Sequence, residues 1–588
     1  MDGGIGIRDR FWVDGGRWVN GLGCVGLEGG LNCGLLGVRG MFLGNSKFCA
    51  SRLLTDREEN NAIAMIAVEN AFLISILALN VKLCTNYPNK VFAFIELVGG
   101  FLVYHGVDGT STTFNFREKA PQAASERMYL DENGQIKDNS NHEGPLSVGV
   151  PGTVAGLWMA HGKLGSKPWA DLVKPSVELA EKGFPSTWDM QDILSYFQKQ
   201  KQPVFAAAKK AFLKNGTDLY TPGELWKQPD LAASLKRIQL QGRDGFYKGE
   251  TAALLEAYMK KHGGIITAKD LANYEAEELK PIIGNYRGFD IIGMPPPSSG
   301  GVAIMEMLNM LEKYDLRKMG PNSAEYLHVL TEVMRRAFAD RAQYIGDPNF
   351  NKDMPIEKLI SKDYAELLAA SIQMDKASKS DSAAFGSLYL PKESDETTHF
   401  SVVDAWGNAV SVTYTLEYSY GSRLMADGTG FLLNNEMGDF NPVPGVTNRK
   451  GQVGTAPNLV APHKRMLSSM TPTIVALDGK PVLVIGSPGG RTIINTVLQV
   501  ILNVIDHSMN MGEAIETPRI HHQWLPDQTS MEGWGFSPDT KKLYEAMGHP
   551  SVSRGKQGQA MGIYIDPTTK IRYGAADSRS FDGGVAGY

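Results

Sequence analysis

Cysteine is almost absent from this 588-residue chain, and what there is gathers at one end. The four cysteines are Cys24, Cys33, Cys49 and Cys84, so the rest of the chain offers no disulfide, no thiol nucleophile and no thiolate metal ligand. The 11 histidines show no ligand spacing. His521 and His522 are adjacent in an extended segment, where neighbouring side chains point to opposite faces. We predict no catalytic metal and no cofactor.

Long runs of one charge sign and long apolar runs are also missing. The formal net charge is −5 and basic residues are scattered, so the chain lacks the footprint of a protein that binds nucleic acid or an anionic membrane. Its most apolar run, residues 71–79, is far shorter than the ~20 residues that span a bilayer. We predict a buried helix there, no membrane span and a small-molecule substrate. No export signal is visible in residues 1–44.

Neither of two familiar glycine motifs indicates a functional site in this chain. Residues 21–26 spell G-x-G-x-x-G, but no convincing strand precedes them and no amphipathic helix follows, which disfavours a dinucleotide site. The G-x-S-x-G motif of α/β-hydrolases is not completed around Ser487, because Ile485 occupies its first glycine position. With 43% hydrophobic and 21% charged residues the composition is that of a globular protein, with two domains or one large composite domain.

What is present is an unusual junction at Glu396-Thr397. A polar connector, residues 376–394, leads to it, and two alternating runs, 397–404 and 409–416, then predict a hairpin. If the chain is cut before Thr397, that residue gains a free α-amine that can accept the proton of its own hydroxyl, so one residue supplies nucleophile and base. An uncut hairpin with a threonine at its edge is the simpler alternative.

Further along, a strand at 482–486 turns into a helix at 493–505 through Gly489 and Gly490. Backbone amides at such a helix entry can form an oxyanion hole, or the glycines can simply permit a tight turn. Arg117 ends an earlier strand, where its guanidinium can grip a carboxylate with two bonds or form a surface ion pair. The helix predicted at 324–344 carries Arg341 on what reads as a solvated or ion-paired face.

Several motifs taken together resemble those of the γ-glutamyltranspeptidases, in order and spacing. The resemblance covers about residues 100–588 and rests on segments 116–121, 151–156, 296–301, 397–404, 433–440, 467–473 and 486–490 and on the closing Ala586-Gly587-Tyr588. It implies an α+β fold of the N-terminal-nucleophile hydrolases, with two stacked sheets between helical layers. It also implies one precursor that cuts itself between Glu396 and Thr397.

The same resemblance implies a division of the chain. Residues 101–396 would form the large subunit and 397–588 the small, catalytic one. We expect residues 1–100 to be either divergent from the family or wrongly predicted from the gene. A periplasmic or extracellular location is expected from the family.

The resemblance also assigns roles to single residues. Thr397 would be the nucleophile, oriented by Thr415, with Gly489 and Gly490 as the oxyanion hole. For the substrate, the α-carboxylate would be held by Arg117, Ser468 and Ser469, and the α-ammonium by Glu436 and Asp439. Glu417 stands where many members carry asparagine and is assigned to substrate contact. Lys450 stands where some bacterial members place a tyrosine over the substrate.

The expected activity is γ-glutamyl transfer and hydrolysis. The enzyme would form a γ-glutamyl ester on Thr397 from glutathione or another γ-glutamyl compound and pass the group to water, an amino acid or a dipeptide. Two alternatives stay open: an acylase of the same fold that takes a non-glutamyl group, such as a cephalosporin acylase, and a non-catalytic chain whose first 100 residues prevent cleavage.

Overall fold

The computed structural model describes residues 10–13, 17–20, 98–188, 190–380, 397–446, 454–580 and 583–587. Glu396, Lys450 and the helix predicted at 71–79 lie outside these residues. Strands β1 (Arg10–Val13) and β2 (Arg17–Asn20) form an antiparallel hairpin that belongs to a first compact unit. All other described elements belong to a second unit, residues 70–587. Across the described part of the chain, no helix combines the length and apolar character that crossing a bilayer requires.

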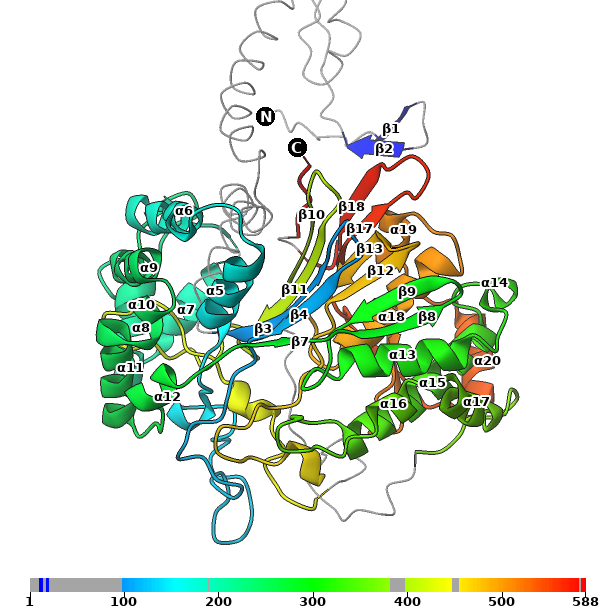
Figure 1. Cartoon of the computed structure of the whole chain (residues 1–588), viewed down its shortest axis with the longest axis horizontal. Coiled ribbons are helices and arrows are strands. Elements are labelled where there is room, and N and C mark those ends of the chain that lie inside the picture. Colours follow the sequence, from blue (N-terminus) through cyan, green and yellow to red (C-terminus); the bar gives the residue numbers. More distant parts are fainter. Residues whose placement is uncertain are drawn as a thin grey trace, which may run out of the picture. The chain divides into compact units, whose positions relative to one another are not determined.

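The second unit is built around two antiparallel sheets (Figure 1). One has five strands in the order β10 (Thr398–Val403), β11 (Ala409–Thr415), β3 (Gly99–His105), β4 (Ser111–Asn115) and β7 (Glu277–Leu279). The other has six, in the order β18 (Arg572–Ala576), β17 (Met561–Ile565), β13 (Lys480–Gly486), β12 (Thr473–Leu477), β9 (Phe289–Gly293) and β8 (Ile282–Tyr286).

The two sheets stack face to face, with β10 and β11 packed on β13. All seven residues of β11 are buried, because the strand has another layer on each side. Side chains of β3 alternate between two hydrophobic cores: Leu102 joins the core shared with the first group of helices, and Phe101 and Val103 join the core shared with the second sheet.

Helices cover the outer face of each sheet (Figure 1). Next to the five-stranded sheet lie α5 (Thr153–Leu164), α6 (Trp169–Lys182), α7 (Gln191–Lys199), α8 (Ala206–Phe212), α9 (Pro229–Gln241), α10 (Asp244–Tyr247), α11 (Gly249–His262) and α12 (Ala268–Ala272). The other group contains α13 (Gly300–Leu311), α14 (Leu316–Met319), α15 (Ala324–Tyr344), α16 (Ile356–Leu359), α17 (Lys362–Ala370), α18 (Thr492–Ile505), α19 (Met511–Glu516) and α20 (Pro538–Ala546).

Residues 300–311 of α13 are all buried, as expected of a helix held between a sheet and further helices. Smaller sheets, β5 (Phe184–Pro185) with β6 (Leu225–Trp226), and β14 (Ile520–His521) with β15 (Thr529–Glu532) and β16 (Ser551–Arg554), lie outside the sandwich. The layers run helix, sheet, sheet, helix, which confirms the predicted α+β architecture.

Each large sheet mixes strands from both sides of Thr397. In the five-stranded sheet β11 pairs with β3, and in the six-stranded sheet β12 pairs with β9. The predicted subunit boundary at 396/397 is therefore not a boundary between compact bodies.

Candidate active site

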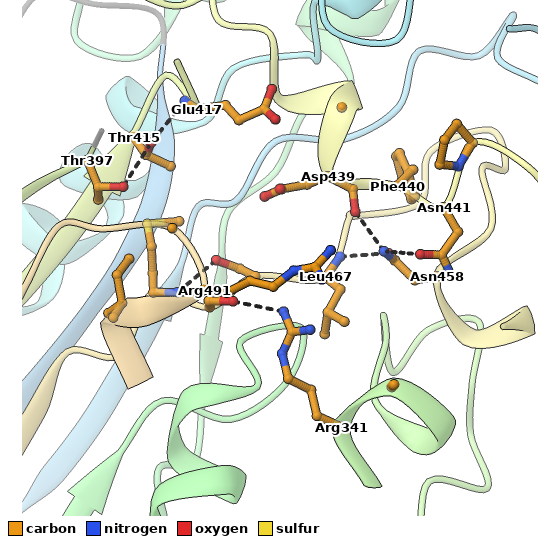
Figure 2. A pocket seen from close by; sticks show the side chains of 18 of the residues that line it. Arg341, Thr397, Thr415, Glu417, Asp439, Phe440, Asn441, Asn458, Leu467 and Arg491 are labelled. Carbon is orange, nitrogen blue, oxygen red and sulfur yellow. Dashed lines mark hydrogen bonds between the residues drawn. The ribbon is translucent and has the colours of Figure 1, made fainter. Parts of the chain in front are cut away.

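Thr397 lies directly before β10, the edge strand of the five-stranded sheet. In the β10–β11 register Thr398 faces Tyr414, which brings Thr397 beside Thr415 at the end of β11. The Thr397 hydroxyl donates a hydrogen bond of 3.3 Å to Thr415 Oγ1 (Figure 2). The hairpin predicted from sequence is confirmed, and its geometry gives Thr415 a position from which it can orient the Thr397 hydroxyl.

Thr415 is itself held from the other side. The backbone N–H of Glu417 donates to Thr415 Oγ1 at 2.9 Å (Figure 2). Glu417 has a φ of +78°, a backbone conformation that residues other than glycine rarely adopt. Strain of this kind gathers at functional sites, where the surrounding structure has to maintain it.

The two glycines form the turn from β13 into α18. Gly489 and Gly490 have φ values of +134° and +54°, and Gly489 O accepts hydrogen bonds from Thr492 N at 3.0 Å and Thr492 Oγ1 at 2.7 Å. Gly490 lines the same pocket as Thr397. The turn thus lies at the N-terminal end of a 14-residue helix, where backbone amides favour a developing negative charge.

Seven of the predicted site residues line one pocket. They are Thr397, Thr415, Glu417, Asp439, Ser468, Ser469 and Gly490. They come from five separate segments of the small-subunit range, and the sandwich brings them together. The pocket also receives His142 and Arg341 from the range before Thr397.

Arg117 does not line this pocket but lies behind it, fully buried. Its guanidinium forms ion pairs with Glu436 and Asp439 and donates to Leu467 O at 3.4 Å. Asp439 stands between Arg117 and the pocket, with 32% of its side chain exposed. The predicted carboxylate fork is therefore occupied by two protein carboxylates, and these three residues form one charged cluster.

A third carboxyl group faces the same guanidinium. Glu118 Oε2 lies 3.5 Å from Arg117 Nη1. It fits only because Gly99 has no side chain, since a Cβ there would lie 2.3 Å from Glu118 Oε2. Burial raises the pKa of Glu118 to about 8, against the opposing effect of Arg117, and burial also raises the pKa of Glu436. One cation shared by three acids favours the neutral form of the two fully buried ones.

The Ser468-Ser469 loop is fastened to the turn before α13. Ser468 O accepts hydrogen bonds from Ser299 N at 2.8 Å and Ser299 Oγ at 2.7 Å. Arg341 then donates to Ser299 Oγ and to Ser469 Oγ, each at 2.8 Å. Both predicted serines are thus held rigidly at the pocket wall.

Asn458 joins this loop to the acidic side of the pocket. Its Nδ2 donates to Asp439 O at 2.7 Å, and its Oδ1 accepts from Leu467 N at 2.8 Å (Figure 2).

Among the residues that the structure describes, no cluster of histidine, cysteine and acidic side chains is arranged to hold a metal ion.

Comparison with known proteins decides the family. The profile described as Gamma-glutamyltranspeptidase matches residues 98–588. The chain belongs to the γ-glutamyltranspeptidase family. It is 45% identical over 490 residues to the Glutathione hydrolase proenzyme of Escherichia coli (strain K12), covering 83% of this chain and 84% of that one.

Acylases are also among the relatives of this γ-glutamyltranspeptidase-family chain. The Acylase ACY 1 proenzyme of Pseudomonas sp. (strain SE83) is 38% identical over 432 residues, covering 72% of this chain and 74% of that protein. The crystal structure of cephalosporin acylase from Bacillus halodurans superposes with a TM-score of 0.74 at 23% identity, covering 88% of this chain and 92% of that one. At that identity the match supports the fold.

The sequence did not predict that two residues, Arg341 and His142, lie at the pocket of this family member. Arg341 was expected on a solvated or ion-paired helix face, whereas it lies at the pocket and holds Ser469. His142 was not singled out, because no local pattern distinguishes it. Only the folded chain brings it beside Glu417, at 2.9 Å from Nδ1 to Oε1.

Proposed function

We propose that this chain is a self-processing γ-glutamyltransferase and glutathione hydrolase. The observation that carries the proposal is the Thr397 hydroxyl, hydrogen-bonded to Thr415 in a pocket that also contains Asp439, Ser469 and Gly490. A nucleophile, a helix entry and groups for a charged substrate thus share one cavity.

In the first step the Thr397 oxygen attacks the γ-carbonyl carbon of the donor. The hydroxyl proton passes to the α-amine of Thr397, which is free once the preceding peptide bond is cut. The carbonyl oxygen becomes an oxyanion that the amides of the Gly489-Gly490 turn stabilise. When the C–N bond breaks, the ammonium of Thr397 returns the proton to the leaving amine, and an ester remains on Thr397.

In the second step the ester is consumed. Water or the amine of an amino acid or dipeptide attacks the same carbonyl carbon, and the α-amine of Thr397 takes the proton from the attacking group. The C–O bond to Thr397 then breaks, and its oxygen recovers a proton. Glutamate is the product with water, and a new γ-glutamyl amide is the product with an amine.

Charge pattern supports the choice of substrate. A γ-glutamyl group carries a carboxylate and an ammonium at its far end, so recognition needs hydrogen-bond donors and a cation for one and carboxylates for the other. Ser468, Ser469 and Arg117 are proposed for the carboxylate, and Asp439, Glu436 and Glu417 for the ammonium. Because Asp439 lies over Arg117, donor binding would have to divide this ion pair between the two substrate charges.

The resemblance to acylases defines the competing proposal: an acylase whose substrate carries an acyl group without an α-ammonium. Asp439→Ala decides between them, with the glutaryl anilide as the matched substrate that lacks the amino group. For a γ-glutamyl enzyme we expect the variant to lose about 2–5 kcal/mol of binding to the γ-glutamyl anilide, as for a broken charge pair, and little for the glutaryl anilide. Equal effects on both substrates would favour the acylase.

The cleavage is tested by expressing the full chain and running a denaturing gel with N-terminal sequencing. We expect two fragments, one of which begins Thr-Thr-His-Phe, together with hydrolysis of γ-glutamyl-p-nitroanilide. Thr397→Ala should give a single chain of 64.2 kDa without activity. An intact wild-type chain that still hydrolyses the anilide would refute the N-terminal-threonine mechanism.

A further inference from the structure

His142 and Glu417 form a buried pair in the wall of the active-site pocket. His142 Nδ1 lies 2.9 Å from Glu417 Oε1, and the two side chains are 3% and 8% exposed. Both residues line the pocket that contains Thr397. Two ionisable groups placed together at a reaction centre, rather than on the surface, call for a functional explanation.

The surroundings fix the position of this pair. The imidazole stacks on the ring of Tyr418, with centroids 5.1 Å apart and an angle of 5° between the planes. Gly438 makes room for it, since a Cβ there would lie 2.2 Å from His142 Nδ1 and 2.7 Å from Glu417 Oε2. His142 O accepts a hydrogen bond from Asn435 Nδ2 at 3.2 Å.

Glu417 also leads directly to the nucleophile. Its N–H donates to Thr415 Oγ1, the atom that accepts the Thr397 hydroxyl. Its carboxyl group points back toward His142, and Oε2 has no hydrogen-bond partner within the described residues. Oε2 is thus an enclosed carboxylate oxygen without a partner beside the pocket, and a donor group of the substrate can satisfy it.

Several charges act on the Glu417 carboxyl. Burial is the largest influence and raises its pKa to about 7; Asp439 also raises the pKa, while His142 and Arg117 lower it. Glu436 and Tyr129 face the same group. Glu417 therefore changes charge in the physiological range, and His142 opposes the rise that burial causes.

We propose that His142 is a positioning residue for donor recognition: it keeps the Glu417 carboxylate charged and oriented, so that its unpartnered oxygen, Oε2, pairs with the α-ammonium of the γ-glutamyl group. The inference rests on the proposed function. It makes selectivity for the ammonium depend on pH, and it assigns that dependence to a residue of the large-subunit range that does not touch the reacting atoms.

The test compares two substrates over pH 6 to 8. One is γ-glutamyl-p-nitroanilide and the other is glutaryl-p-nitroanilide, which lacks only the amino group. Both need the same base at Thr397, so the ratio of their kcat/KM values cancels that titration and isolates the ammonium site. For the wild type we expect the ratio to fall by up to about tenfold from pH 8 to pH 6, with a midpoint near 7.

His142→Phe keeps a flat ring against Tyr418 but removes the nitrogen. Since His142 lowers the pKa of Glu417, the midpoint should move to higher pH, with about a tenfold loss of the ratio at neutral pH for each unit it moves. His142→Asn keeps an N–H donor close to the position of Nδ1 and should restore part of the ratio. If His142→Phe does not mature, the midpoint of His142→Asn decides, because that side chain carries no charge.

A double-mutant cycle separates a positioning role from a general structural one. In a Glu417→Gln background the ratio should not vary with pH, and adding His142→Phe should change it no further. His105→Phe is the control, because His105 is equally buried at 3% exposure but bonds Ser111 of β4 and Gly479 O in the turn between β12 and β13. It should leave the wild-type profile unchanged.

The outcomes distinguish the inference from the function on which it rests. A mature wild type that ignores γ-glutamyl-p-nitroanilide would refute the proposed function. A γ-glutamyl-selective wild type whose midpoint is unaffected by His142→Phe and His142→Asn would refute only the role of His142. Equal losses from His142→Phe in the wild-type background and in the Glu417→Gln background would do the same.

Discussion

Single residues at this site are governed by burial as much as by charge. Arg117 is a single guanidinium in contact with Glu118, Glu436 and Asp439, two of which are fully buried. A buried ion pair contributes little net stability compared with apolar packing, but removing one partner leaves a charge without compensation. Arg117 is therefore a structural residue of the pocket as well as a proposed substrate ligand.

Replacing Arg117 by Met should destabilise the protein by about 3–5 kcal/mol, because Asp439 loses its ion-pair partner and the buried Glu118 and Glu436 lose the guanidinium that they face. The loss should grow as the pH rises through about 8, the pKa of Glu118 in the folded chain, because Arg117 lowers the cost of charging that buried carboxyl and Met does not. Urea unfolding in a Thr397→Ala background, which keeps one uncut chain, measures it. Arg117→Lys is the control that keeps the charge, and an equal loss in both variants would contradict the electrostatic explanation.

The sequence predicted which residues belong to the site better than it predicted which side chains contact them. Thr397, Asp439, Ser468 and Ser469 fall in motifs, Thr415 was assigned by its position in the same resemblance, and the structure brings all five to one pocket. The occupation of Arg117 by acids, and the presence of Arg341 and His142, depend on contacts between distant segments, which no local pattern encodes. The roles of all these residues stay predictions until variants are measured.

Among the elements, the turn from β13 into α18 is the most demanding in backbone geometry. Gly489 has a φ of +134°, and a Cβ there would lie 2.6 Å from Thr492 Oγ1. The same turn is proposed to stabilise the oxyanion. The backbone conformation of the turn and its proposed role in catalysis therefore both require that residue 489 has no side chain.

Gly489→Ala should lower kcat for γ-glutamyl-p-nitroanilide by about 100-fold, because a small displacement of the amides misplaces the oxyanion hole. Gly216→Ala is the matched control: its φ is +76° with nothing within 4 Å of an added Cβ. It should cost about 1–2 kcal/mol of stability and leave kcat unchanged. Similar kcat values for the two variants would argue against an oxyanion hole in this turn.

The second helical layer contains a pair of acids at its centre. Glu306 of α13 is 1% exposed and hydrogen-bonds Asp340 of α15, which also accepts from Tyr364 Oη at 2.7 Å. Burial and the adjacent Asp340 raise the pKa of Glu306 well above its ordinary value. The folded chain thus holds a proton that the unfolded chain has released at neutral pH.

Stability should therefore decline as pH rises above about 4.5 toward the pKa of Glu306 in the folded chain, because the folded state binds more protons than the unfolded state in that range. Glu306→Gln keeps a donor for Asp340 and has no proton to lose. We expect its free energy of unfolding to exceed that of the Glu306 chain by a margin that grows from pH 5 to pH 8, in urea titrations of the uncut Thr397→Ala chain. A margin independent of pH would contradict this assignment.

Element positions followed well from periodicity. The helix predicted at 324–344 is α15, Ala324–Tyr344, and the runs 397–404 and 409–416 contain β10 and β11. Strand partners did not follow. Nothing in the local pattern says that β11 pairs with β3, because that choice is made by packing both faces of the sheet.

At the scale of the whole second unit, residues 70–587, the segments before and after Thr397 are interleaved. Both sheets take strands from each side of Thr397, so cutting the chain there would divide the sequence without dividing the core. The sequence could suggest two subunits by resemblance, but only the strand order predicts that neither would keep its fold alone.

After cleavage the two fragments should stay together. We expect them to co-elute in gel filtration at the position of the uncut Thr397→Ala protein and to separate only under denaturing conditions. Separating them would expose strand edges and apolar faces that the sandwich buries. Independent elution of two folded fragments would show that the interleaved sheets do not hold the mature protein together.

The shared sheets also change what refolding means for this protein. Refolding of the uncut chain would be a unimolecular process, at a rate that dilution does not affect. Once the bond before Thr397 is gone, the β11–β3 and β12–β9 pairings join two molecules, so recovery becomes a bimolecular encounter and the melting temperature comes to depend on concentration. After maturation the protein would depend less on its ability to refold and more on kinetic stability, that is, on slow unfolding.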